Sequence, residues 1–137
     1  MKNFGLIFLI FTLVFLTGVN SAYSQKKPAE VAKEVSNAIK NGNAREIAKH
    51  FGSNVDLNFP GNEGTFSRNQ AELILRNFFQ GNAPASFSVQ HEGSSRDGSP
   101  YVIGNYRSKK GDAFRVYFLI KNISGNTVLH LLQFEKQ

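Results

Sequence analysis

The hydrophobic and polar positions of this chain change their period near residue 81, and that change divides the predicted elements into two groups. Before it, the apolar positions largely recur at helical spacing, and after it they alternate with polar positions as in strands. The spacing predicts helices from Pro28 to Asn41, from Asn43 to Phe51 and from Ser67 to Gly81. One half-buried strand, Val55 to Phe59, and a brief one at Thr65-Phe66 lie between the second and third helices.

Start and stop signals support these helices. Pro28 suits the first turn of the first helix, and Gly42 follows its last residue. Asn43 is predicted to cap the second helix. Ser67 and Gln70 form a capping box at the start of the third helix. The third helix has a broad apolar face that is expected to pack on a sheet, formed by Ala71, Ile74, Leu75, Phe78 and Phe79.

Alternation after residue 81 predicts a meander of four antiparallel strands. Turns rich in Gly, Asp, Asn and Ser separate the expected strands, which are Ser86 to His91, Tyr101 to Arg107, Ala113 to Lys121 and Thr127 to Glu135. We therefore expect an α+β fold in which three N-terminal helices pack on one face of a curved antiparallel sheet.

The first 24 residues have the pattern of a cleaved secretory signal peptide. Lys2 precedes an apolar stretch from Leu6 to Leu16 that is too short to span a bilayer. Small residues then favour cleavage before Gln25, with cleavage before Tyr23 as the alternative. The pattern predicts a signal peptide at residues 1–24 and a single exported domain at 25–137, periplasmic or secreted and without a stable membrane anchor.

Composition removes several classes of function. The chain has no cysteine, which excludes a disulfide framework and a catalytic thiolate. Its net charge of +6 is spread along the sequence without a run of like charges, so no nucleic-acid partner is expected. The histidines lack metal-ligand spacing and no cofactor motif is present, so neither a metal nor a cofactor is expected.

Several short pieces of the chain carry a family resemblance. They are Gly42-Asn43, His50-Phe51, Phe66-Ser67 with Gln70-Ala71, Phe78-Phe79, Phe87, and Tyr101 with Gly104. With these pieces the chain resembles the short exported bacterial proteins grouped as domain of unknown function 4783. The order of its elements resembles the cone-shaped nuclear transport factor 2-like (cystatin-like) fold. The resemblance implies a fold and a compartment, and it supplies no catalytic residues.

Strand parity predicts which side chains face the helices. If Arg107 pairs with Ala113 and Lys121 with Thr127, one set of alternate, mainly apolar residues from the last three strands faces the helices. On this parity three residues become candidates for a ligand pocket in the hollow of the cone, namely His91, Tyr106 and His130. The competing interpretation of the two histidines is structural, with ring nitrogens bonded to backbone or water.

The same parity gathers apolar side chains on the outer face of the sheet. The residues expected there are Tyr101, Ile103, Tyr117, Leu119, Leu129 and Leu131. An apolar patch of this kind is typical of a protein interface and predicts a homodimer, unless loops or the C-terminal residues cover it.

These patterns favour an exported, non-enzymatic domain that binds a small molecule or a protein partner. No set of catalytic residues is recognisable, because the carboxylates lie at turns, helix starts or the wet side of a strand. The alternative is an enzyme of the dehydratase or isomerase kind that uses His91 or His130 with Tyr106. If aromatic side chains fill the hollow, a purely structural or interaction role remains.

Overall fold

The structure is a computed structural model that describes residues 26–137, so the predicted signal peptide lies outside the described residues. Its helices in this range are α2 (Pro28–Asn41), α3 (Ala44–Ala48) and α4 (Arg68–Gly81). Its strands are β1 (Phe51–Phe59), β2 (Asn62–Ser67), β3 (Pro84–Ser94), β4 (Pro100–Ser108), β5 (Ala113–Ile123) and β6 (Asn126–Lys136).

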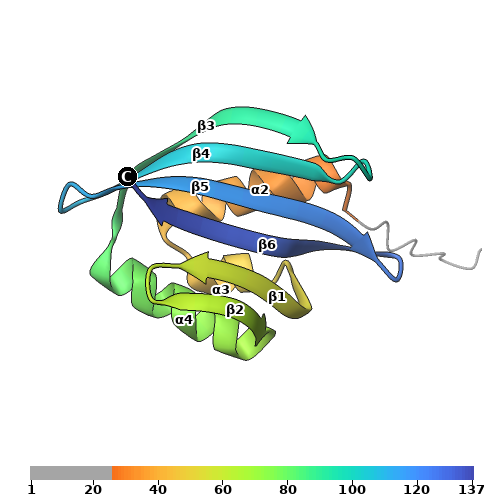
Figure 1. Cartoon of the computed structure of the whole chain (residues 1–137), viewed down its shortest axis with the longest axis horizontal. Coiled ribbons are helices and arrows are strands. Elements are labelled where there is room, and N and C mark those ends of the chain that lie inside the picture. The colour runs from red at the N-terminus through yellow and green to blue at the C-terminus, as the bar shows by residue number, and fades with distance from the viewer. Residues whose placement is uncertain (1–25) are drawn as a thin grey trace, which may run out of the picture.

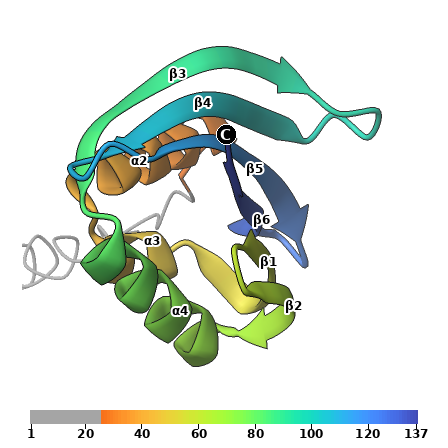
Figure 2. The ribbon, with the colours of Figure 1, turned by 60° about the vertical axis from the view of Figure 1, so that its left-hand side comes forward.

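The strands form one curved sheet in the order β2-β1-β6-β5-β4-β3. Strands β1 and β6 are parallel, and all other neighbouring strands are antiparallel. Figure 2 shows the sheet bending around the helices, which all lie on its concave side. In the view of Figure 1, β4 and β5 pass in front of α2. The fold is thus α+β as expected, although the helices are not one N-terminal block, because β1 and β2 precede α4.

Helix α2 packs on the sheet through the predicted stripe. Pro28 stands in its first turn, and Gly42 ends it in the left-handed conformation with φ of 63°. A Cβ at Gly42 would also meet the ring of Pro84 at 2.9 Å, so glycine is required there for two reasons. The buried side chains of α2 are Val31, Ala32, Val35, Ala38 and Ile39.

The second helix is shorter than the spacing predicts. Asn43 caps it as expected, since its side-chain oxygen accepts a hydrogen bond from the Glu46 amide at 3.1 Å. The helix ends at Ala48 rather than Phe51, because Phe51 is the first residue of β1, where it pairs with Leu129. Burial of the Phe51 ring, which is 1% exposed, therefore prevails over continuation of the helix.

The capping box that opens α4 is confirmed. The Ser67 hydroxyl accepts from the Gln70 amide, and the Gln70 side chain accepts from the Ser67 amide, both at 3.3 Å. The apolar face of the helix then lies on the sheet, with Ala71, Leu75 and Phe79 buried and Ile74 and Phe78 partly buried.

Strand pairing agrees with the prediction between β4 and β5 and differs between β5 and β6. Arg107 lies opposite Ala113 as expected. Lys121 lies opposite Val128 instead of Thr127, and an irregularity between Leu119 and Ile120 leaves His130 without a Cα partner. This extra residue is a β-bulge, which shifts the alternation of faces by one position.

A second bulge lies on the edge strand β3. Val89 pairs with Gly104 and His91 pairs with Ile103, so Gln90 is the extra residue. Alternation from Phe87 therefore stops at Gln90, and His91 falls on the outer face.

Aromatic side chains fill the interior of the cone next to α4. The ring of Phe78 has its centroid 4.8 Å from that of Phe134, 5.1 Å from Phe59 and 5.2 Å from Phe114. Tyr106 packs in the same cluster and is 1% exposed. The hollow expected in this part of the fold is occupied by the core itself.

Candidate functional site

Tyr106, one of the three predicted pocket residues, is a core residue. Its hydroxyl donates a hydrogen bond to the backbone carbonyl of Asn82, just after α4. Burial raises the pKa of the Tyr106 phenol above its ordinary value of 10.0, so the hydroxyl stays protonated and keeps donating. The geometry gives Tyr106 a structural role in fixing the end of α4.

His91 lies outside the cone, and the predicted inward orientation of this residue is wrong. Its Nε2 lies 3.1 Å from the hydroxyl of Tyr101, on the outer face of the sheet, and its side chain is exposed. The bulge at Gln90 is the reason, because it moves His91 onto the opposite face from Phe87.

His130 also points outward, again against the prediction. Its Nε2 lies 4.0 Å from Oδ2 of Asp56. Asp56 alternates with the buried Val55 and Leu57, which places its carboxylate on the outer face of β1. His130 is therefore separated from Tyr106 by the sheet, so the three predicted pocket residues do not meet.

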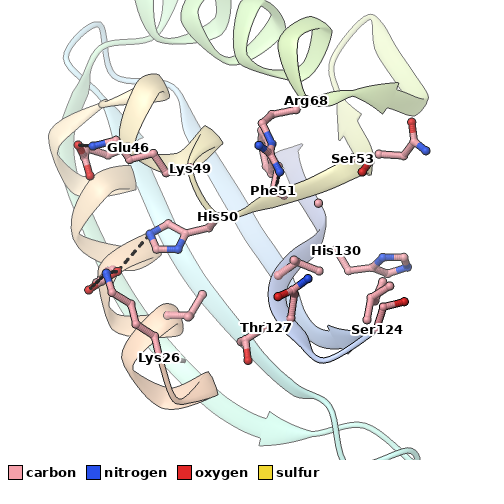
Figure 3. Close-up of a pocket in the computed structure, with 17 residues that line it drawn as sticks. Lys26, Glu46, Lys49, His50, Phe51, Ser53, Arg68, Ser124, Thr127 and His130 are labelled. Atoms are coloured by element: carbon pink, nitrogen blue, oxygen red, sulfur yellow. Dashed lines mark hydrogen bonds and ion pairs between the residues drawn. The ribbon is translucent and has the colours of Figure 1, made fainter. Parts of the chain in front are cut away.

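The structure instead has an open groove between α2, the start of β1 and the hairpin that joins β5 to β6, which we call the α2–β1 groove. Its volume is about 830 Å³. Figure 3 shows His50 in the middle of this groove with its ring directed toward α2, while His130 is turned away at the border. The lining includes apolar side chains from Val31, Phe51 and Ile123 and hydroxyl groups from Ser53, Ser124 and Thr127.

A carboxylate between two basic groups occupies one side of the groove. Nε2 of His50 lies 3.3 Å from Oε2 of Glu34, and Nζ of Lys26 lies 2.8 Å from both carboxylate oxygens of Glu34. Burial lowers the pKa of His50, and the nearby Glu34 opposes that shift. A neutral His50 whose Nε2–H faces Glu34 keeps Nδ1 as a hydrogen-bond acceptor.

The remaining charges of the groove are mostly paired. Nζ of Lys49 lies 2.6 Å from Oε1 of Glu46 on α3. Nη2 of Arg68 donates to the carbonyl oxygen of Phe51 at 2.8 Å, and no carboxylate pairs with Arg68 among residues 26–137. The groove therefore offers one guanidinium group, several hydroxyl groups and one polarised histidine to a bound molecule.

The sequence pattern gives His50 the interpretation of a surface or packing residue and assigns no role to Glu34. His50 lies just beyond the end of α3, in a segment that the pattern assigned to a longer helix. Its contact with Glu34 forms only after α2 packs next to the start of β1. The sequence offers one local signal for Glu34, which is the neighbour of Val35, a residue of the buried stripe of α2.

The outer face of the sheet carries most of the predicted apolar residues. Register places Tyr101 opposite Leu119, and Leu119 opposite Leu131. The outer patch consists of Tyr101, Ile103, Tyr117, Leu119 and Leu131, all partly exposed. Leu129 is an exception, because the bulge at His130 turns it inward, where it is 0% exposed. Its predicted place in the outer interface is wrong.

Two further observations concern metal binding and membrane insertion in the residues that the structure describes. No group of three or more His, Asp or Glu side chains in residues 26–137 has the geometry to hold a metal ion. No helix in that range is long and apolar enough to cross a membrane.

Comparison with known proteins identifies relatives for almost the whole described range. A family model described as "Domain of unknown function (DUF4783)" matches residues 32–135. A DUF4783 family protein from Bacteroides ovatus ATCC 8483 is 31% identical, with a TM-score of 0.70, over 83% of this chain and 98% of that one. Another, from Bacteroides fragilis YCH46, is 29% identical, with a TM-score of 0.68, over 76% and 96%.

More distant structures show the fold alone. An NTF2-like protein of unknown function from Cytophaga hutchinsonii ATCC 33406 is 13% identical, with a TM-score of 0.59, over 84% of this chain and 94% of that one. The chain therefore has the nuclear transport factor 2-like fold that its element order resembles. No curated protein matches it.

Proposed function

Because this chain belongs to the DUF4783 family, described only as a domain of unknown function, we propose its function from its own groove: an exported, non-enzymatic domain that binds a small polar molecule. The observation that carries the proposal is the α2–β1 groove, whose volume of about 830 Å³ falls in the range of ligand sites. The aromatic core leaves no comparable space beside Tyr106.

The lining of the groove supports recognition of a ligand more than its transformation. Glu34 and Glu46 each have a lysine partner, so neither carboxylate is an isolated base. Hydroxyl groups and the remaining N–H groups of Arg68, which has no carboxylate partner among residues 26–137, can hydrogen-bond to a polar molecule, while Val31 and Phe51 contact its apolar parts.

Native mass spectrometry of protein purified from its own host tests this proposal. Wild-type protein is expected to retain a small molecule. Ser53→Trp, which fills the groove from β1, is expected to lose it, and Ser88→Trp on the exposed side of β3 serves as the matched control. Retention by the Ser53 variant, or no bound molecule in any sample, contradicts the proposal.

A second candidate function is acid–base catalysis of the dehydratase or isomerase kind. The Glu34–His50 contact favours it, because a carboxylate that orients an imidazole leaves the other ring nitrogen free as a base. The residues would be these two, since His91, Tyr106 and His130 lie apart. NMR of the bound molecule during incubation separates the two functions: conversion by wild type and none by His50→Gln supports an enzyme, and an unchanged spectrum supports binding.

Export belongs to the same proposal. The mature chain is expected to begin at Gln25, or at Tyr23, and to fractionate outside the cytoplasm. Mass measurement of the protein from a cell-envelope or medium fraction decides this, and a mature form that retains the first 22 residues contradicts it.

A further inference from the structure

A second pocket lies where the aromatic core reaches the surface, between α4, the β1–β2 turn and the ends of β5 and β6. We call it the aromatic pocket, and its volume is about 360 Å³. Its lining includes the rings of Phe59, Phe78 and Phe114 together with Lys110 and Lys136. We propose that this pocket binds a planar aromatic molecule of one or two rings that carries a carboxylate.

The floor of the aromatic pocket has the geometry to receive a flat ring. Phe59 and Phe114 are each 3% exposed, whereas Phe78 is only partly buried and so opens toward solvent. The ring planes of Phe59 and Phe114 meet that of Phe78 at 69° and 78°. Ring faces and ring edges therefore meet in one small space, where an added aromatic ring can pack edge-to-face.

The rim of the pocket supplies an excess of positive charge. Nζ of Lys110 lies 3.5 Å from Asp112, and Nζ of Lys136 lies 3.9 Å from the same carboxylate. One carboxylate thus serves two ammonium groups, which leaves one positive charge unbalanced. Both lysine side chains are more than half exposed, so either can turn toward a ligand carboxylate.

The opposite rim is held in place by the core. The Asn82 amide donates to the carbonyl oxygen of Phe78 at 2.8 Å, and the Asn82 side chain donates to the same oxygen at 3.3 Å. The buried Tyr106 hydroxyl donates to the carbonyl of Asn82. The end of α4 is therefore fixed before a ligand arrives, which lowers the entropy cost of binding.

Fluorescence titration with 2-naphthoate tests the inference, because the protein has no tryptophan to obscure the naphthalene signal. The uncharged 2-naphthalenemethanol has the same ring system and isolates the contribution of the carboxylate. We expect 2-naphthoate to bind about tenfold more tightly than the alcohol, which corresponds to about 1.4 kcal/mol. Equal affinities, or no binding of either probe at millimolar concentration, overturn the proposal.

Two sets of variants locate the binding. Lys110→Gln combined with Lys136→Gln is expected to reduce 2-naphthoate affinity to that of the alcohol. Lys40→Gln combined with Lys109→Gln removes the same charge outside the pocket and is expected to change it little. Ser53→Trp is expected to leave naphthoate binding intact, so a loss there would place the probe in the α2–β1 groove and overturn the aromatic pocket. An unchanged affinity in the Lys110/Lys136 variant overturns it as well.

Discussion

Among single residues, the two phenylalanines near the end of α4 pack this helix against the aromatic core. Phe79 is 7% exposed and Phe78 contacts several aromatic rings of the core, as their spacing predicted. Replacing the buried Phe79 by alanine is expected to lower the free energy of unfolding by about 3–5 kcal/mol, and replacing the partly buried Phe78 is expected to lower it by less. Leu73, which is 54% exposed on the same helix, is the control, and Leu73→Ala is expected to cost less than about 0.5 kcal/mol. Urea denaturation measures all three, and a loss below about 1 kcal/mol for Phe79→Ala contradicts its burial.

His50 is a second single residue with a testable effect, because its protonation is expected to make the stability of the protein depend on pH. Burial holds its pKa in the folded protein below the ordinary value of 6.5, with Lys26 and Lys49 acting in the same direction and Glu34 and Glu46 opposing. Between the folded and unfolded pKa values the unfolded chain binds more protons, so stability present above pH 6.5 is lost as the pH falls through that window.

The expected result is a decrease in the free energy of unfolding of wild-type protein between pH 7.5 and pH 5, measured by denaturation at each pH. His50→Gln is expected to flatten that decrease, because the residue no longer titrates. His91→Gln, at an exposed position, is the matched control and should keep the wild-type slope. An identical slope in the His50 variant would show that burial of its ring does not govern the pH response.

At the scale of elements, the capping box decides where α4 begins. Ser67→Ala removes the oxygen that accepts from the Gln70 amide and is expected to cost about 1 kcal/mol of stability. Ser67→Asp restores an acceptor at this position and is expected to remain within about 0.5 kcal/mol of wild type. Thermal or urea unfolding distinguishes the two variants, and equal losses would mean that the cap is not what stabilises this end.

The pattern of the sequence predicted the elements well and failed at single irregular residues. The predicted register of β4 against β5 is correct, because inward-facing and outward-facing residues alternate in both strands without interruption. The prediction failed for His91 and His130, since one extra residue in β3 and another in β6 each shift the alternation. Neither Gln90 nor His130 is a residue type that indicates a bulge, so the sequence carries no local signal for either shift.

At the scale of the whole molecule, the fold class was predictable and the groove was not. The order of helices and strands follows from the local periodicity of hydrophobic residues, which is visible in the sequence itself. The α2–β1 groove joins side chains from α2, β1 and the β5–β6 hairpin, which meet only in the folded chain. The filling of the cone was likewise unpredictable in detail, because it depends on how the rings around Phe78 pack together.

The sheet as a whole has one face that no element covers within residues 26–137, and there we expect two copies of the protein to meet. The outer patch is apolar where an exposed antiparallel face is usually polar. Beside it Arg115 lies opposite Glu135, and neither takes part in an ion pair within the described chain. A twofold axis through the patch would place Arg115 against the partner's Glu135 and repeat the same contact in reverse, so the surface is complementary to itself in charge and in apolar character.

Light scattering at tens of micromolar is therefore expected to show a homodimer for the mature wild-type protein. Leu131→Asp should give a folded monomer, because it places like charges at the centre of the contact. Arg115→Glu should weaken the dimer by opposing two glutamates, and adding Glu135→Arg should restore it, since the exchanged charges again attract across the axis. Arg115 and Glu135 are also cross-strand neighbours within one chain, so urea denaturation must show that Arg115→Glu leaves each chain as stably folded as wild type before its rescue by the double exchange is assigned to the dimer contact. A monomeric wild type, or a double variant no better than Arg115→Glu alone, contradicts this interface.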